Sequence, residues 1–175
     1  MKFIKVINNM CLFKKRSKSR LVSFSATDGD YDFVDLGLSV KWANKNIGAG
    51  IQEGVGAYFN YDEVKKTGVC LPTVDEVREL FEKCKIRYNK KSNGFDVTGV
   101  NGNKIFLPIG GEREGNAHYE GSYFWTCSDH ERGYMEGYKY YGCVYLGSKV
   151  LKKVKTGTEL LRRGEFWINV REVKR

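Results

Sequence analysis

The sequence predicts a single α+β domain that follows a strongly basic N-terminal arm. At 175 residues, the chain can bury one substantial core but is short for two domains. Hydrophobic residues make up 41% and aromatic residues 14% of the chain, with only two prolines, which is typical of a packed protein. Twenty glycines indicate many turns, as expected for short strands arranged around one or two helices.

The positive charge is unevenly placed along the chain. Residues 1–20 hold seven basic residues and no acidic one, whereas the formal charge of the whole chain is +9. Residues 149–175 hold nine basic and three acidic residues, so the middle of the chain is net acidic. A segment as basic as residues 1–20 favours phosphate, anionic lipid or an acidic protein surface. A solvated charge run is the alternative interpretation.

We expect an arm and linker over residues 1–30 and a folded domain over residues 31–175. The run from Ser23 to Asp32 is rich in Ser, Thr, Asp and Gly, which is typical of a linker. Helix, strand and extended chain all stay open for the first 13 residues, because the apolar spacing is helical but the segment is short and contains β-branched residues. The candidate anchoring residues are Phe3, Lys5, Ile7, Phe13, Lys14, Lys15, Arg16, Lys18 and Arg20.

One helix is predicted over about residues 74–85. Pro72 ends the preceding segment, and Thr73 with Glu76 forms a capping box at the helix start. Apolar side chains then recur on one face of the helix, at Val77, Leu80, Phe81 and Cys84.

Short strands are predicted around this helix. The runs Phe95–Val100 and Lys104–Leu107, separated by Asn-Gly-Asn, have the pattern of a β-hairpin. Four further strands, bounded by glycines or charged turns, are expected at Val34–Trp42, Ser122–Cys127, Tyr138–Leu146 and Phe166–Val173.

An ordered string of short motifs covers about residues 31–175. The motifs are Val34-Asp-Leu-Gly-Leu-Ser-Val-Lys-Trp42-Ala, Asn46-Ile-Gly-Ala49, Gly56-Ala-Tyr-Phe59, Leu71-Pro-Thr73, Val97-Thr-Gly99, Asn101-Gly-Asn-Lys-Ile-Phe-Leu-Pro108, Gly121-Ser-Tyr-Phe-Trp-Thr-Cys-Ser128 and Val170-Arg-Glu-Val173. Together they resemble the Fibrobacter-type major paralogous domain, a family abundant in anaerobic gut bacteria. The sequence departs from that family at Asn60-Tyr-Asp-Glu63, where a Trp and a Gly-Glu pair are usual, and at the Arg171-Glu-Val173 ending.

The resemblance implies a fold related to C-type lectins and to formylglycine-generating enzymes. In such a fold the two ends of the domain lie close together and the helix after the Leu-Pro-Thr motif packs on a sheet. The basic segments at the two ends of the chain would then converge on one side of the molecule.

The aromatic residues and glycines of these motifs are expected to form the framework. Large side chains should fill the core at Trp42, Phe59, Phe106, Trp125 and Trp167. Glycine should permit turns at Gly37, Gly48, Gly56 and Gly99.

The sequence does not predict an enzyme, a metal site or a cofactor. Cys127 with His130 or His118 could form an activated pair, but Cys127 lies inside a predicted strand and is expected to be half-buried. Two further ligands would be needed for zinc, and the Glu-Pro-Asn type of calcium signature found in lectins is absent. The paired-cysteine site of the formylglycine-generating relatives cannot be located either.

A polar, glycine-rich loop at Gly110–Gly121 is the candidate ligand-facing surface, with an ordinary solvated loop as the alternative. Its side chains able to contact a ligand are Glu112, Arg113, Asn116, His118 and Tyr119.

Five cysteines without a C-x-x-C pair favour a reduced compartment, and Lys5 with Asn8 and Asn9 interrupts any signal-like apolar run. We therefore expect a phage virion protein that is assembled in the host cytoplasm. It would be a capsid-decorating or tail-associated subunit that binds capsid or tail proteins through its arm. The alternatives are a cytoplasmic nucleic-acid-binding protein and a carbohydrate- or protein-binding module of a bacterial cell.

Overall fold

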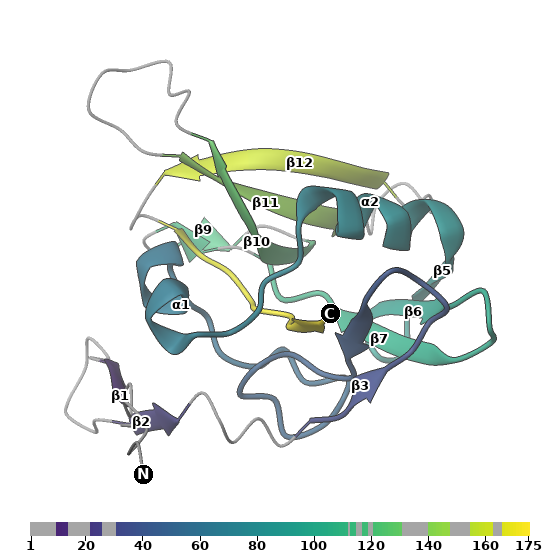
Figure 1. Ribbon diagram of the computed structural model, residues 1–175, viewed down its shortest axis with the longest axis horizontal. Coiled ribbons are helices and arrows are strands. Elements are labelled where there is room, and N and C mark those ends of the chain that lie inside the picture. The colour runs from purple at the N-terminus through teal and green to yellow at the C-terminus, as the bar shows by residue number, and fades with distance from the viewer. Residues whose placement is uncertain are drawn as a thin grey trace, which may run out of the picture.

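The structure is a computed structural model that describes the backbone of residues 10–13, 22–25, 31–111, 113–114, 117–118, 121–130, 140–147, 155–162 and 166–175. These residues form two helices and several small antiparallel sheets, which confirms the α+β class (Figure 1). Within these ranges no helix has the length and apolar character needed to span a membrane.

The two ends of the domain meet in one small sheet. Strand β4 (Lys41–Ala43) lies between β3 (Phe33–Val34) and β14 (Val173–Lys174), and both neighbours are antiparallel to it. Trp42 is paired with Val34 on one side and with Val173 on the other. The first and last strands of residues 31–175 therefore flank a single central strand.

The prediction of one continuous strand over Val34–Trp42 is wrong, because the chain reverses between β3 and β4. The Asp35 carboxylate accepts a hydrogen bond of 2.7 Å from the Gly37 amide, and Gly37 has a φ of 74°. Only glycine adopts this left-handed backbone without strain. The turn folds β3 back onto β4, so the two halves of the predicted strand pair with each other.

Both helices begin with a reciprocal cap. Helix α2 (Val74–Lys83) starts at Thr73 with the predicted capping box to Glu76, and it ends two residues earlier than predicted because Cys84 is extended. Helix α1 (Tyr61–Thr67) was not predicted, although Asn60 and Glu63 form the same kind of box. The departure from the resembled family at residues 60–63 is thus the start of a helix.

The predicted hairpin is confirmed as β6 (Gly94–Thr98) and β7 (Lys104–Pro108), with β5 (Lys85–Asn89) added on the other side of β6. The side chains of Asn101 and Asn103 donate hydrogen bonds of 2.9 and 2.8 Å to the Asp35 carbonyl oxygen. These bonds tie the hairpin turn to the turn between β3 and β4.

A further three-stranded sheet contains β10 (Ser122–His130), β11 (Tyr140–Gly147) and β12 (Lys155–Arg162). Strands β10 and β11 match the predicted positions, whereas β12 was not predicted. Lys and Gly are disfavoured in strands, so the sequence of β12 does not by itself predict a strand. The strand is formed by pairing with β11.

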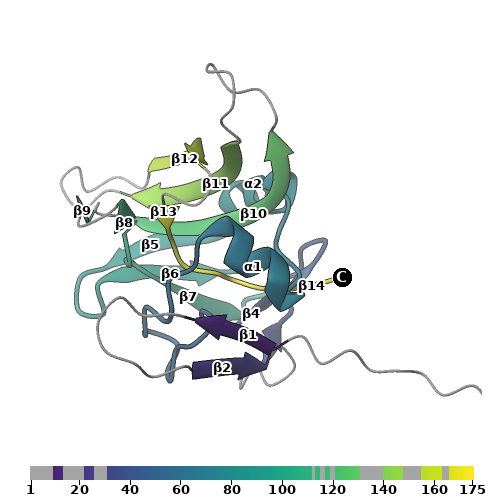
Figure 2. The same ribbon diagram turned by 90° about the vertical axis from the view of Figure 1, so that its left-hand side faces the viewer.

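Part of the arm forms a hairpin of β1 (Met10–Phe13) and β2 (Val22–Ser25). Of the three conformations left open, the strand is therefore the one present at residues 10–13, and the predicted linker begins inside β2. Figures 1 and 2 place this hairpin and the β10–β12 sheet at opposite ends of the molecule.

The predicted strand Phe166–Val173 changes partner along its length. Strand β13 (Phe166–Trp167) pairs with β8 (Arg113–Glu114), which also pairs with β9 (Ala117–His118). Ile168 then exchanges backbone hydrogen bonds of 2.9 and 3.1 Å with Phe59, and the chain reaches β4 only at β14. The segment is therefore a seam joining several elements.

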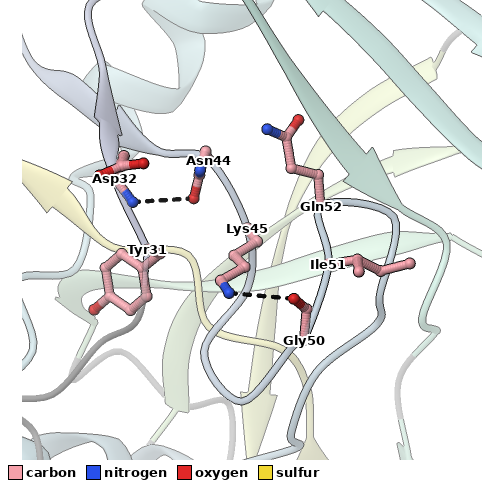
Figure 3. Close-up of a pocket in the computed structure, with 7 residues that line it drawn as sticks. All are labelled: Tyr31, Asp32, Asn44, Lys45, Gly50, Ile51 and Gln52. Atoms are coloured by element: carbon pink, nitrogen blue, oxygen red, sulfur yellow. Dashed lines mark hydrogen bonds between the residues drawn. The ribbon is translucent and has the colours of Figure 1, made fainter.

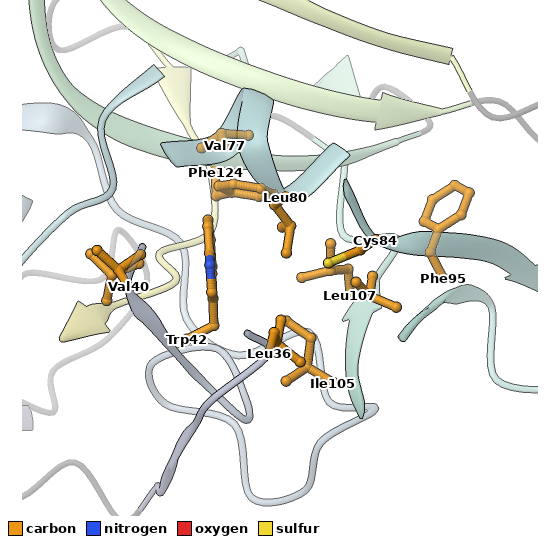
Figure 4. Packing of buried hydrophobic residues seen from close by; sticks show 12 residues of the cluster. Leu36, Val40, Trp42, Val77, Leu80, Cys84, Phe95, Ile105, Leu107 and Phe124 are labelled. Carbon is orange, nitrogen blue, oxygen red and sulfur yellow. The ribbon is translucent and has the colours of Figure 1, made fainter. Parts of the chain in front are cut away.

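Two buried clusters form the core, and β10 contributes to both. Phe124 packs into the first cluster against Trp42, with ring centroids 6.3 Å apart, beside Val77 and Leu80 of α2 (Figure 4). The second cluster contains Trp125, whose indole N–H donates a 2.8 Å hydrogen bond to the Phe59 carbonyl oxygen. The core prediction is confirmed for Trp42, Phe59, Phe106 and Trp125, while Trp167 is only half-buried.

Arg171 is buried, and none of the described residues offers it a carboxylate partner. Its Nη1 and Nη2 donate hydrogen bonds of 2.9 and 2.8 Å to the carbonyl oxygens of Ala43 and Phe106, while its Nε has no partner among these residues. Burial lowers the pKa of the guanidinium to about 9, so the group is still charged at neutral pH. Arg171 thereby links the C-terminal seam to β4 and β7.

The described residues of the two basic segments do not converge, although the seven basic side chains of the arm themselves lie outside the described residues. Strand β12, which belongs to the basic residues 149–175, lies at the end of the molecule opposite the arm hairpin (Figures 1 and 2). Arg171 of the same segment is buried, and Arg175 is paired with Glu76. The positive charge near the C-terminus is therefore divided among distant places.

Candidate functional site

A polar pocket of about 250 Å³ opens where the chain enters the folded domain. One wall is formed by Tyr31 and Asp32, the centre by Asn44 and Lys45, and the far wall by residues 50–52 (Figure 3). The pocket was not predicted from the sequence. Its only signal is the concentration of amide and glycine residues between positions 44 and 54.

Hydrogen bonds from the backbone and from side chains hold the walls of the pocket in place. The Asn44 amide donates to the Asp32 carbonyl oxygen at 2.8 Å, and the Asp32 amide donates to Asn44 Oδ1 at 3.2 Å. Lys45 Nζ donates to the carbonyl oxygen of Gly50 at 3.4 Å. The turn beyond is closed by a 3.1 Å bond from Gly54 to the Ile51 carbonyl oxygen. The site is therefore preformed.

Several polar groups remain available in this pocket. The Asp32 carboxylate, the Asn44 Nδ2 group and the Gln52 amide have no hydrogen-bond partner in the part of the chain that the structure describes. Ile51 lies at the rim and is 65% exposed, a rare degree of exposure for a large hydrophobic side chain among the described residues. This combination can hold a small ligand that both donates and accepts hydrogen bonds and presents one apolar edge.

Tyr31 connects the pocket to the C-terminal seam. Its hydroxyl donates a hydrogen bond to the Glu172 carboxylate, which also accepts one of 3.3 Å from the Cys70 amide. Burial of the phenol, together with the neighbouring Glu172 carboxylate, raises the pKa of Tyr31 above its usual range. Tyr31 is therefore a neutral donor at physiological pH and serves to fix the pocket wall.

A second polar cluster lies at the start of α2. Arg175 binds the Glu76 carboxylate through Nε at 2.9 Å and through Nη2 at 2.8 Å, and its Nη1 donates to Cys70 Sγ at 2.6 Å. The hydrogen bonds with Glu76 raise the pKa of Arg175. Arg175 therefore links the end of β14 to the start of α2 and to Cys70.

The exposure of Cys127 contradicts the expectation that it is half-buried. Its amide donates a 2.9 Å hydrogen bond to the Pro72 carbonyl oxygen, but its side chain is exposed. The register of β10 on β11 shifts between Trp125 and Asp129, which breaks the regular alternation of the strand at this position. Across the described residues, no group of three or more Cys, His, Asp or Glu side chains could hold a metal ion.

The candidate ligand-facing residues of the loop fall partly outside the described residues. Arg113 lies in β8 and His118 in β9, facing each other in register, so this stretch contains a short hairpin. Glu112, Asn116 and Tyr119 lie outside the described residues.

The candidate arm residues are similarly divided. Phe13 lies at the end of β1, paired with Val22 of β2. The other eight anchoring candidates, Phe3, Lys5, Ile7, Lys14, Lys15, Arg16, Lys18 and Arg20, lie outside the described residues.

Comparison of the chain with protein-family models, curated proteins and solved structures finds no match.

Proposed function

We propose that this protein is a non-enzymatic binding domain of the C-type-lectin-like kind, held on a larger assembly by its basic arm. The observation that carries the proposal is the placement of the arm hairpin β1–β2 at one end of the molecule and the β10–β12 sheet at the other (Figure 2). A subunit built in this way can attach at one end and present the rest of its surface outward.

The lectin-like assignment is supported by the sheet that joins both ends of the domain. Strands β3 and β14 flank β4, so the two ends of the domain meet in one sheet and the rest of the domain lies between them in the sequence. Helix α2 follows the Leu-Pro-Thr motif and packs Val77 and Leu80 into the first core cluster. Both features agree with what the resemblance implies, and the preformed pocket at residues 31–52 is a suitable contact site.

The assembly that we propose is a phage capsid or tail, and this part of the proposal rests on the resemblance and on the charge of the arm. Seven basic residues without an acidic one within residues 1–20 favour an acidic partner surface. Such attraction weakens with salt, because the screening length falls from about 10 Å at 0.1 M to about 3 Å at 1 M. Burial of arm side chains such as Phe3 and Ile7 would add a contribution that salt does not screen.

The test is recruitment of the chain to purified particles after the arm has been changed. Five basic arm residues, Lys14, Lys15, Arg16, Lys18 and Arg20, are replaced by serine. The matched control replaces five exposed lysines of the folded domain, Lys66, Lys85, Lys90, Lys91 and Lys104, so that the net charge changes equally. We expect only the arm variant to be lost from particles in mass spectrometry, and recruitment of both variants at the level of the unchanged chain would contradict the anchoring role.

Nucleic-acid binding is the second candidate, favoured by the same basic segment with interleaved aromatic residues. Nuclease treatment of the assembly separates the two candidates. Release of the protein by nuclease supports nucleic acid as the partner, whereas retention supports a protein surface.

A further inference from the structure

The sheet of β5, β6 and β7 has one face in the core and one outer face. The core face contributes Phe95, Val97 and Ile105 to the first core cluster. Successive residues of a strand point to opposite faces, so the alternate residues belong to the outer face. Those with charged or hydroxyl side chains are Lys85 and Arg87 of β5, Asp96 and Thr98 of β6, and Lys104 of β7, and all but Thr98 are exposed.

The strand register arranges the basic residues of this outer face. Lys85 is paired with Thr98, which is paired in turn with Lys104. Neighbouring strands lie about 4.8 Å apart, so the two lysines leave the backbone about 10 Å apart in one row across the sheet. Arg87 follows two residues along β5, about 7 Å from Lys85. Three cations therefore stand at separate, fixed positions on one face.

The acidic residue of the outer face does not neutralise these cations. Asp96 lies opposite Arg87 in the register, but its carboxylate accepts hydrogen bonds of 3.1 and 3.3 Å from Asn89 Nδ2. Within the described part of the chain, Lys85, Arg87 and Lys104 form no ion pair. Their charge is therefore available to a partner.

The turn between β5 and β6 extends the basic surface. Lys90 and Lys91 are exposed there, and Asn89 Oδ1 accepts a 3.1 Å hydrogen bond from the Lys91 amide. Residues 85–108 thus hold five basic residues and one acidic residue, whereas residues 21–175 as a whole hold 23 basic and 21 acidic residues. The positive excess of the folded domain is concentrated in this sheet.

The chemistry of the outer face fits the phosphate backbone of a duplex better than a single strand. Lys and Arg supply the sequence-independent attraction to nucleic-acid phosphates, and cations 7–10 Å apart can meet different phosphates, which follow at about 3.4 Å along each strand of a duplex. Single strands are held in addition by bases stacked on aromatic side chains. The aromatic side chains of this sheet are not available for stacking, because Tyr88 packs against Phe95 in the core and Phe106 is buried.

We propose that the outer face of the β5–β6–β7 sheet binds double-stranded nucleic acid through its phosphate backbone, without sequence preference. Lys85, Arg87 and Lys104 contact the phosphates, and Lys90 and Lys91 extend the contact beyond the end of β5. This site is separate from the arm. The control variant of the recruitment experiment changes four of these lysines and should still join the particles, so the two proposals fail independently.

The test measures binding of a short fluorescent DNA duplex by anisotropy over a range of salt concentrations. Because the arm also attracts phosphates, the reference protein is the full chain with the five arm residues replaced by serine. Adding Lys85→Gln with Lys104→Gln should weaken binding about tenfold at 0.1 M salt and reduce the slope of log K against log salt by about two, one for each lost contact. Lys85→Arg with Lys104→Arg keeps the charge and should bind as the reference does.

The matched control adds Lys65→Gln with Lys66→Gln to the same reference. These lysines are exposed on α1, which lies on the other side of the molecule (Figure 1), so their loss should leave the binding and the salt slope unchanged. Equal effects of the two Gln pairs would overturn the proposal. So would tighter binding of the single strand than of the duplex, or binding to vesicles of anionic lipid but not to the duplex.

Discussion

At the scale of single residues, Arg171 shows how a charge is accommodated in the core. Its guanidinium has no carboxylate neighbour among the described residues, yet it donates hydrogen bonds to two backbone carbonyl oxygens. Removing it would leave those carbonyl groups buried and unpaired, which costs more than the hydrogen bonds themselves are worth.

We therefore expect Arg171→Ala to destabilise the protein by about 3–5 kcal/mol, from two orphaned carbonyl groups and the cavity left by the side chain. Urea unfolding followed by circular dichroism measures the change. Lys174 is an exposed basic residue nearby, and Lys174→Ala should change the free energy of unfolding by less than about 0.5 kcal/mol. Similar values for the two variants would show that Arg171 has no structural role.

Trp125 is the second residue whose role can be tested in isolation. It is fully buried against Tyr61, with ring centroids 5.4 Å apart. Trp125→Ala should cost about 3–5 kcal/mol, while Trp125→Phe keeps most of the apolar area and loses the hydrogen bond to Phe59, at about 1–2 kcal/mol. A Trp125→Ala protein that remains as stable as the parent but fails to join its partner would place Trp125 at a contact surface.

Features that depend on neighbouring residues in the sequence could be predicted, whereas features that depend on contacts between distant segments could not. The core positions of Trp42 and Trp125 follow from aromatic residues inside β-rich runs. The exposure of Cys127 depends on a register shift against β11, a strand more than ten residues away. The approach of Arg175 to Cys70 depends on β14 joining β4, which no local pattern encodes.

At the scale of elements, the two helices illustrate the same difference. The sequence predicts α2 because a capping box is followed by periodic apolar residues, whereas α1 has a capping box but only seven residues. Short helices are marginal without tertiary contacts. In the structure those contacts are made by Tyr61 and Val64, which are buried in the second core cluster.

Glu79 of α2 connects the helix to the turn between β3 and β4. Its carboxylate accepts a hydrogen bond of 3.1 Å from the Ser39 amide and one of 2.8 Å from Lys83 Nζ. These hydrogen bonds lower the pKa of Glu79 to about 2. The bond from Lys83 has the largest effect, and the bond from the Ser39 hydroxyl has the next largest.

Because the folded-state pKa of Glu79 lies below its ordinary value near 4.5, its stabilising contribution is complete above that pH and is lost as the pH falls toward 2. We expect Glu79→Gln to cost about 1 kcal/mol at pH 7. The difference from the parent chain should shrink between pH 4.5 and 2 in urea unfolding. A difference that does not change over this range would show that the charge of Glu79 is not what stabilises the turn.

At the scale of the whole molecule, the domain should not depend on a bound metal ion for its stability. The described residues contain no cluster of three or more candidate ligands. We expect EDTA to change the melting temperature by less than about 5 °C, and a change of 5 °C corresponds to about 1–2 kcal/mol for a chain of this size. A larger decrease would reveal a metal site that includes residues beyond the described ranges.

The small sheet at the ends of the domain also determines how the protein would respond to mechanical force. Strands β3 and β14 run parallel to each other on either side of β4. Pulling residues 31 and 175 in opposite directions would load the hydrogen bonds of these strands together, in shear, instead of opening them one after another. The tension would pass through the three strands, and it would also act on the pocket wall at Tyr31 and Asp32 and on the start of α2, to which Arg175 is bound through Glu76.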